Sequence, residues 1–190
     1  MSDVIFPIRT ERLELRAFSE DDLDALHDMQ RRPEVTRFLR WDTRTRGESR
    51  EMLARRVTQT DLVKEGDNLA AAVVLRESGA LIGDFNLELT DAGLGCAEIG
   101  FAMNPTHAGR GYATEAGGAL LRLAFEHFGF HRVVGICNGR NAASMQLMER
   151  LGMRREGYFV QSDVLKGKRV DVASYAILRQ EWFGRRPVSS

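Results

Sequence analysis

The sequence predicts an α/β (α+β) fold in which helices flank a mixed, mostly antiparallel central sheet. Three consecutive segments between residues 69 and 103 have the alternation and the turns of an antiparallel meander. A strongly amphipathic helix follows directly, and further helices and strands come after it. A chain of 190 residues with 43% hydrophobic composition suits one well-buried core. We therefore expect one domain over residues 1–190.

The first part of the chain predicts one strand and two helices. Residues 9–18 alternate leucine with charged side chains, which is the period of a strand with one face in water. Ser19, with Asp22 three residues later, forms an acidic capping box, and its helix runs to about residue 31. A second capping box, with Thr45 as the cap, begins a polar helix that we expect to be exposed.

The middle of the chain predicts three strands joined by tight turns. The strands cover residues 69–76, 81–89 and 96–103, and apolar side chains alternate most regularly in the second. Turns that contain glycine connect them at residues 77–80 and 91–93. Short connections of this kind join antiparallel neighbours, so these strands form a meander.

Helices and strands alternate in the second half of the chain. Pro105 ends the third strand of the meander, because proline cannot donate to a ladder. A helix follows, then a strand over residues 131–138 and a short helix over residues 141–151. Two strands separated by residues 166–168 complete the chain. Crossover helices in the middle and hairpins at both ends predict a mixed sheet.

Two glycines, Gly109 and Gly111, precede the central helix and predict an anion-binding loop. Without a Cβ, glycine lets the backbone turn tightly and approach a ligand closely. The first amides of the helix have no intrahelical acceptors and can donate to phosphate oxygens. No Lys-Ser/Thr pair and no third glycine follow at the spacing of the common nucleotide loops. The helix has an apolar stripe formed by Ala113, Ala116, Gly117, Leu120, Leu121, Ala124, Phe125 and Phe128.

A second motif, Asn-Ala-Ala-Ser-Met-Gln-Leu-Met-Glu-Arg-Leu-Gly-Met, begins at residue 141. An Asn141 cap bonded to the amide of Ser144, with Gly152 ending the helix, explains the motif without any ligand. A ligand-binding role for Asn141 is the alternative.

Together these runs resemble the GNAT N-acetyltransferases, in particular the RimJ/RimL-type branch of ribosomal-protein-alanine N-acetyltransferases. The run Gly-Arg-Gly-Tyr-Ala-Thr-Glu-Ala from Gly109 is similar to the family's acetyl-CoA pyrophosphate loop, and the run from Asn141 to its second signature. Residues 9–16 and 167–182 also resemble the branch, so the resemblance covers nearly the whole chain.

The resemblance implies an enzyme that uses acetyl-CoA, releases coenzyme A and needs no metal. Thr106 and Met153 depart from the residues of many relatives, but neither change removes a backbone donor. The implied donor-binding residues are Phe101, Ala102, Met103, Gly109, Arg110, Gly111, Tyr112, Ala113, Thr114, Asn141 and Ser144.

Glu98 is the favoured catalytic base. The resemblance implies direct attack of an amine on the thioester, without a covalent acyl-enzyme, and this attack needs a proton acceptor. Strand alternation places Ile99, Phe101 and Met103 on one face and Glu98 on the other. Water and Glu115 are the alternatives, although the first helical turn already explains Glu115 as a carboxylate that complements the dipole.

For the departing thiolate, the resemblance implies Ser144 as proton donor, with Tyr158 as the alternative. A hydroxyl is a weak acid, so Ser144 can act by hydrogen bonding to the thiolate as much as by proton transfer. Neither Cys96 nor Cys137 lies near a histidine in a catalytic pairing, which agrees with direct attack. Both lie in apolar runs, and we expect them to be buried and reduced.

Charge and hydropathy narrow the classes of partner. Lys and Arg balance Asp and Glu at 27 each, so no global field favours nucleic acid. No apolar run reaches membrane-spanning length and the amino terminus lacks a signal-peptide core, so we expect a cytoplasmic protein without a membrane partner. The resemblance adds an amine acceptor and a homodimer as expectations.

The sequence leaves other functions open. A non-catalytic acyl-CoA-binding or regulatory module would keep the fold with Glu98 and Ser144 as structural residues. A nucleotide-binding protein is a second alternative, which the missing Lys-Ser/Thr pair disfavours. As acceptor, the resemblance favours a protein or peptide amino terminus over a small amine such as an aminoglycoside or polyamine. Residues 33–64 and the final hairpin are expected to determine the choice.

Overall fold

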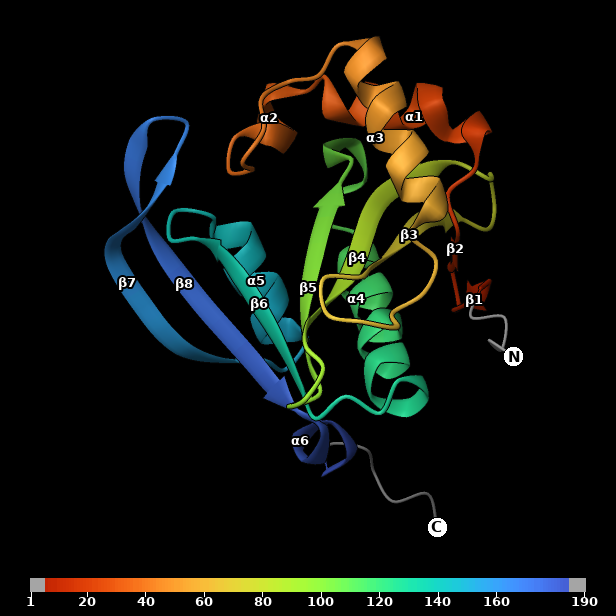
Figure 1. The fold of residues 1–190 in the computed structure, drawn as a ribbon. Coiled ribbons are helices and arrows are strands. Elements are labelled where there is room, and N and C mark those ends of the chain that lie inside the picture. Colours follow the sequence, from red (N-terminus) through yellow and green to blue (C-terminus); the bar gives the residue numbers. More distant parts are fainter. Residues whose placement is uncertain (1–5, 185–190) are drawn as a thin grey trace.

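Eight strands form one mixed sheet in the computed structural model, which describes residues 6–184 (Figure 1). Their order is β1-β2-β3-β4-β5-β6-β8-β7, and only β5 and β6 pair in parallel among the described strands. Helices lie on both faces, which confirms the predicted fold class. The strands are β1 (Ile8–Arg9), β2 (Leu13–Arg16), β3 (Asn68–Leu75), β4 (Leu81–Asp91), β5 (Cys96–Met103), β6 (Arg132–Asn138), β7 (Arg154–Leu165) and β8 (Lys168–Leu178).

The helices begin where the capping residues predict. The Asp22 carboxylate accepts from the Ser19 amide at 2.8 Å, ahead of α1. Thr45 and Glu48 cap each other at the start of α3, with the Thr45 amide 2.7 Å from Glu48 Oε2. Two short helices, α2 and α6, were not predicted. The helices are α1 (Leu23–Gln30), α2 (Pro33–Thr36), α3 (Arg46–Thr58), α4 (Tyr112–Arg122), α5 (Ala142–Arg150) and α6 (Arg179–Gly184).

The prediction of one continuous strand over residues 9–18 is wrong. The structure has two short antiparallel strands there, β1 and β2. Thr10 makes the break. Its hydroxyl accepts from the Leu13 amide at 3.0 Å, and its amide donates to the Leu13 carbonyl at 2.9 Å. A threonine side chain that bonds to nearby backbone offers the chain a turn in place of a ladder.

The parallel pair at the centre of the sheet is short. Residues 96–98 of β5 pair with residues 132–134 of β6, and no pairing continues beyond them. Both strands run on, β5 to Met103 beside β4 and β6 to Asn138 beside β8, and they diverge (Figure 1). We call this divergence the open seam. Beyond Glu98, the β5 edge that faces the open seam has no strand partner in the described part of the chain.

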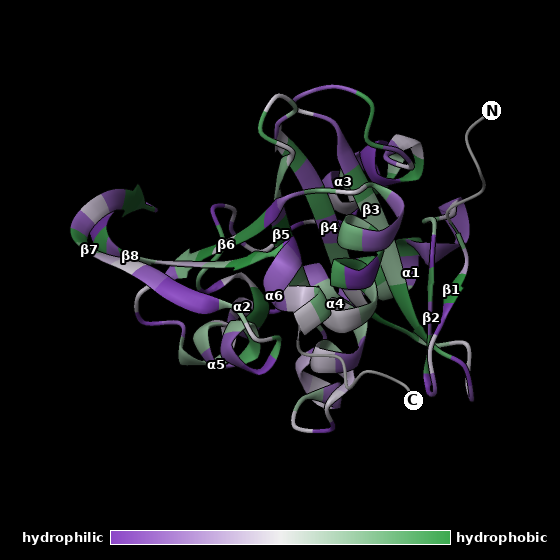
Figure 2. Ribbon diagram, turned by 90° about the horizontal axis from the view of Figure 1, so that it is seen from below, coloured by the Kyte–Doolittle hydropathy of each residue, from purple (hydrophilic) through white to green (hydrophobic). Residues whose placement is uncertain are grey.

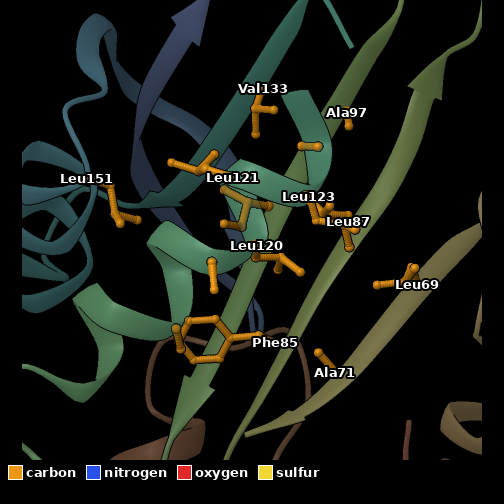
Figure 3. Close-up of a cluster of buried hydrophobic side chains, with 14 of the residues drawn as sticks. Leu69, Ala71, Phe85, Leu87, Ala97, Leu120, Leu121, Leu123, Val133 and Leu151 are labelled. Atoms are coloured by element: carbon orange, nitrogen blue, oxygen red, sulfur yellow. The ribbon is translucent and has the colours of Figure 1, made fainter. Parts of the chain in front are cut away.

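Two hydrophobic clusters hold the helices to the sheet. On one face, Leu120 and Leu121 of α4 point toward Phe85, Leu87 and Val133 of the strands (Figure 3). On the other face, α1 and α3 bury Leu26, Met29 and Leu53 against two alanines of β3, Ala70 and Ala72. The α4 helix continues into a π-helical turn over Leu123–His127. The residues of the predicted apolar stripe lie in or against the first cluster, so the stripe is confirmed.

A buried ion pair ties α3 to β4 within the second cluster. The Arg56 guanidinium lies 3.0 Å from Asp84 Oδ2 and also donates to Gln59 Oε1 and Asn68 Oδ1. The Asp84 side chain is 7% exposed and that of Arg56 is 16% exposed. Burial raises the pKa of the Asp84 carboxyl above its ordinary value, and Arg56 and Arg44 oppose the increase.

The hairpin of β7 and β8 extends from the rest of the sheet and alternates hydrophilic and hydrophobic segments (Figure 2). Tyr158, Phe159, Val160 and Val164 are exposed on it. None of the helices in residues 6–184 is long and apolar enough to cross a membrane. Residues 1–5 and 185–190 lie outside the described residues. The structure therefore describes neither the first residues of the amino terminus, which we expect to lack a signal-peptide core, nor the last residues of the expected domain.

Candidate active site

The glycine loop connects the end of β5 to the start of α4. Gly109 and Gly111 have φ values of +75° and +81°, in the left-handed region that favours glycine. A Cβ at Gly109 would meet nothing within 4 Å, whereas one at Gly111 would lie 3.4 Å from Arg12 Nη2. The backbone is therefore open to approach at Gly109.

Free amides follow the two glycines. Glu115 is the first residue of α4 whose amide bonds back along the helix, to the Gly111 carbonyl at 3.1 Å. Within the described chain, the amides of residues 109–114 have no acceptor. Unpaired amides at a helix start, with the helix dipole behind them, favour an anion. This region includes four predicted donor-binding residues besides the glycines, namely Arg110, Tyr112, Ala113 and Thr114.

Arg12 and Glu115 fasten this loop to the start of the sheet. The Glu115 carboxylate accepts from Thr10 Oγ1 at 2.6 Å, the Arg12 amide at 2.8 Å and Arg12 Nε at 2.7 Å. Burial acts to raise the pKa of Glu115, but these hydrogen bonds outweigh it and lower the pKa below its ordinary value. Arg12 also donates to the Arg110 carbonyl at 2.9 Å and lies 4.7 Å from the centre of the Tyr112 ring.

The second motif lies beside the first. Asn141 Oδ1 accepts from the Ser144 amide at 3.2 Å, which confirms the predicted cap of α5. Arg150 Nε donates to Thr114 Oγ1 at 3.2 Å, so α5 and α4 are neighbours. Because β5 and β6 are parallel, the connections that leave their carboxyl ends lie at the same edge of the sheet. Phe101, Ala102 and Met103 form the end of β5 along the open seam.

Glu98 lies on the face of the sheet opposite α4. Its neighbours Ala97 and Ile99 belong to the α4 cluster, so the predicted alternation is confirmed. Glu88 of β4 is its direct cross-strand partner. Burial raises the pKa of Glu98 above its ordinary value, Glu88 raises it further, and Arg40 opposes the increase. The Glu98 side chain is half-buried, and it lies where the pairing of β5 with β6 ends and the open seam begins.

The two candidate proton donors have different surroundings. The Ser144 hydroxyl, in the first turn of α5, has no hydrogen-bond partner among residues 6–184. The Tyr158 hydroxyl donates to Asp171 Oδ2 at 2.9 Å and lies over Gly139. Cys137 and Cys96 are free thiols, but they are half-buried where full burial was expected. Burial raises the pKa of Cys137 to about 11, so this thiol stays protonated at neutral pH.

The final hairpin meets the loop after α2 on the Glu98 side of the molecule. Arg40 Nη2 lies 2.6 Å from Asp163 Oδ2, and Lys166 Nζ donates to the Thr36 carbonyl at 2.9 Å. An open pocket of about 730 Å³ lies between them. The two segments that the sequence associates with acceptor choice are thus in contact. The pocket is lined by Pro33, Glu34, Thr36, Arg37, Phe38, Asp42, Thr43 and Lys166.

Two residues of the candidate site, Arg12 and Glu88, are not among the residues predicted from the sequence. Arg12 holds the glycine loop from nearly 100 positions away, and no local pattern indicates that contact. Glu88 has a signal, because the alternation of Phe85, Leu87 and Leu89 places it on the outer face beside Glu98 once the hairpin register is counted. The described residues contain no group of three or more His, Cys, Asp or Glu side chains placed to hold a metal ion.

The family model of the GNAT acetyltransferase domain matches residues 12–154 of this chain. The chain therefore belongs to the GNAT family of acetyltransferases. It is an N-acetyltransferase, and such an enzyme requires an amine acceptor. GNAT enzymes use acetyl-CoA as donor.

Relatives of similar length share the sequence and the fold. The chain is 30% identical over 176 residues to the uncharacterized N-acetyltransferase YnaD of Bacillus subtilis, covering 92% of this chain and 98% of YnaD. A GNAT-family acetyltransferase from Bacillus anthracis superimposes with a TM-score of 0.83 at 29% identity, covering 93% of this chain and 100% of that structure. The ribosomal L7/L12 alpha-N-protein acetyltransferase RimL, solved with coenzyme A, shares the fold with a TM-score of 0.79 at 22% identity. The match covers 90% of this chain and 97% of RimL.

Proposed function

We propose that this chain, as one N-acetyltransferase domain, moves the acetyl group of acetyl-CoA to a primary amine by direct attack in a ternary complex. A peptide amino terminus is the first acceptor to test. One observation carries the proposal: the open seam separates an anion-binding helix start on one face of the sheet from a half-buried carboxylate on the other. Donor and acceptor can thus approach the same seam from opposite sides.

The glycine loop and α4 would hold the donor through its phosphates. Free amides at residues 109–114 and the open space beside Gly109 fit a pyrophosphate, and Arg110 is exposed beside them. Phe101, Ala102 and Met103 would offer backbone groups of the unpaired β5 edge to the pantetheine amides. RimL, a fold relative solved with coenzyme A, supports this assignment at the level of the fold. Glu115 would anchor the loop, since its oxygens already accept three hydrogen bonds.

Gly111→Val tests the donor site. A side chain at a φ of +81° strains the turn and contacts the Arg12 guanidinium, so we expect acetyl-CoA affinity to fall roughly ten- to a hundredfold, the value of a lost hydrogen bond to a charged group. Gly79→Val is the matched control, because Gly79 has a φ of +71° in the β3–β4 turn. Equal affinities of the two variants in calorimetry would contradict the assignment.

Asn141→Asp separates capping from ligand binding at the second motif. Aspartate caps a helix as well as asparagine does, so thermal stability should stay nearly the same. A ligand role for Asn141 predicts acetyl-CoA affinity lower by roughly tenfold, since the carboxylate cannot donate a hydrogen bond and repels phosphate. If calorimetry gives wild-type affinity, Asn141 is a cap only.

The chemical step needs two proton movements. The amine nitrogen forms a bond to the thioester carbonyl carbon as the carbon–sulfur bond breaks. Glu98, directly or through a water, takes the proton that the amine loses. The Ser144 hydroxyl gives or shares a proton with the departing thiolate, and we favour it over Tyr158, whose proton is directed to Asp171. With its pKa raised by burial, the protonated Cys137 thiol takes no nucleophilic part.

Ser144→Ala is expected to slow acetyl transfer roughly ten- to a hundredfold, the value of one hydrogen bond to a charged group, while acetyl-CoA affinity is kept. The defect should shrink with an acetyl thioester of a more acidic thiol, because a better leaving group needs less help. Turnover is measured by release of free thiol. A defect that is equally large with both thioesters would point to a structural role.

An acceptor screen tests the function as a whole. Peptides that begin with Ala, Ser or Met, together with small amines, are supplied with labelled acetyl-CoA, and label transfer is measured beside thiol release. Transfer to at least one amine, matched by thiol release, is the expected result. Acetyl-CoA binding without transfer to any amine would favour the non-catalytic alternative.

A further inference from the structure

Two glutamates face each other across the β4–β5 ladder on the acceptor side. Glu88 and Glu98 are directly paired in register, so their Cβ atoms are roughly 4.5–5.5 Å apart. Neither carboxylate makes a hydrogen bond or a salt bridge within residues 6–184. Like charges directly opposite one another destabilise a sheet. The pair is therefore a feature that folding alone does not favour.

The surroundings of the pair do not neutralise it. Arg40 is the cation that acts on Glu98, yet its guanidinium is committed to Asp163 at 2.6 Å. Further along the same face, the Asn86 amide occupies the space over Gly100, where a Cβ would lie 2.5 Å from Asn86 Oδ1. Asp84 follows on β4, nine-tenths buried, and among residues 6–184 its Oδ1 has no partner, although its Oδ2 accepts from Arg56.

The exposure of the two glutamates differs in a way that separates their roles. Glu98 is half-buried and Glu88 is exposed. As the proposed base, Glu98 must lie at the reacting amine. Glu88, exposed on the neighbouring strand, is then placed to contact a second group of the same acceptor.

We infer that the acceptor carries a second positive charge close to its reacting amine, and that Glu88 is the specificity-determining residue that binds this charge. The inference rests on the proposed function, with Glu98 at the reacting amine. The shared chemistry is a short dication, which a polyamine supplies as a second ammonium and a peptide supplies as a lysine next to its amino terminus. A cation placed between the carboxylates also removes their mutual repulsion.

Matched acceptors test the inference in the full-length protein. One pair is 1,4-diaminobutane and 1-aminobutane, and the other is an Ala-Lys peptide and its Ala-norleucine counterpart. We expect kcat/KM to favour the dication of at least one pair by roughly ten- to a hundredfold, as one hydrogen bond to a charged group predicts. The preference should shrink as ionic strength rises.

Variants assign the preference to Glu88. In Glu88→Gln the ratio of kcat/KM values should fall toward one, and Glu88→Asp, which keeps the charge, should retain much of it. Glu77→Gln, an equal charge change in the exposed β3–β4 turn, should keep the wild-type ratio. The pair that shows the preference distinguishes a polyamine from a peptide acceptor.

Three results would overturn the inference, and they differ from one another. If the wild type acetylates both members of each pair equally well, the proposed function stands and the dication is wrong. If none of the four amines is acetylated while other amines are, the acceptor is not a short dication. A failure of the proposed function would appear separately, as the absence of transfer to every amine in the wider screen. An unchanged ratio in Glu88→Gln would remove Glu88 from the acceptor site.

Discussion

Glu98→Gln should lower kcat by on the order of 10²–10⁴, the usual contribution of a positioned acid-base group. Glutamine keeps the shape of the side chain but does not accept the proton that the amine loses. Acetyl-CoA affinity, measured by calorimetry, should stay near the wild-type value, because Glu98 lies on the face opposite the glycine loop. Turnover is measured with an acceptor confirmed in the screen.

The role of Glu98 as a base also predicts how the rate of acetyl transfer changes with pH. A base acts when deprotonated, so the wild-type rate should rise as pH increases through the pKa of Glu98, which burial and Glu88 raise above the ordinary glutamate value. Glu98→Gln should alter this limb, whereas Ser144→Ala should leave it in place. Near wild-type turnover in Glu98→Gln would make the side chain a structural strand residue and leave water as the base.

Arg56→Met is expected to destabilise the fold by about 3–5 kcal/mol, the cost of removing one partner of a buried ion pair. The substitution leaves the Asp84 carboxylate buried and also frees Gln59 Oε1 and Asn68 Oδ1. Urea unfolding measures the loss. Arg50→Met, on the exposed face of the same helix, should stay within about 0.5 kcal/mol of wild type.

The loss in Arg56→Met should depend on pH. Burial already raises the pKa of Asp84 in the folded state, and without Arg56 only Arg44 opposes the increase. A raised folded-state pKa gives stability below the unfolded value that is lost as pH rises through the folded value. The variant should therefore recover stability relative to wild type as pH falls from neutral toward the ordinary aspartate pKa. A pH-independent difference would show that lost packing, not the uncompensated carboxylate, causes the effect.

Most of the fold could be predicted because local signals agree with it. The capping residues Ser19 and Thr45, the turns of the meander and the apolar stripe of α4 each act within a few residues of themselves. The break at Thr10 was missed because a side-chain hydrogen bond overrides the alternating pattern. The short helices α2 and α6 carry too few residues for a periodic signal.

The candidate site was predictable where chemistry follows the backbone and was missed where it follows tertiary contact. Two glycines beside a helix start indicate an anion loop in sequence alone, and their positive φ values agree. Arg12 and Glu88 reach their places only through sheet pairing, which requires the register of strands far apart or a counted hairpin. The roles of Glu98, Ser144 and Asn141 stay predictions.

The open seam divides the sheet into two groups of strands that few residue pairs join. Strands β1–β5 form one ladder and β6–β8 another, and three residue pairs join them, so the junction depends on side chains of α4 and α5. Sub-global opening follows the weakest backbone connection. In native-state hydrogen exchange, the amides that join β5 to β6 over residues 96–98 and 132–134 should lose protection together, at a lower opening free energy than those in the β3–β4 ladder.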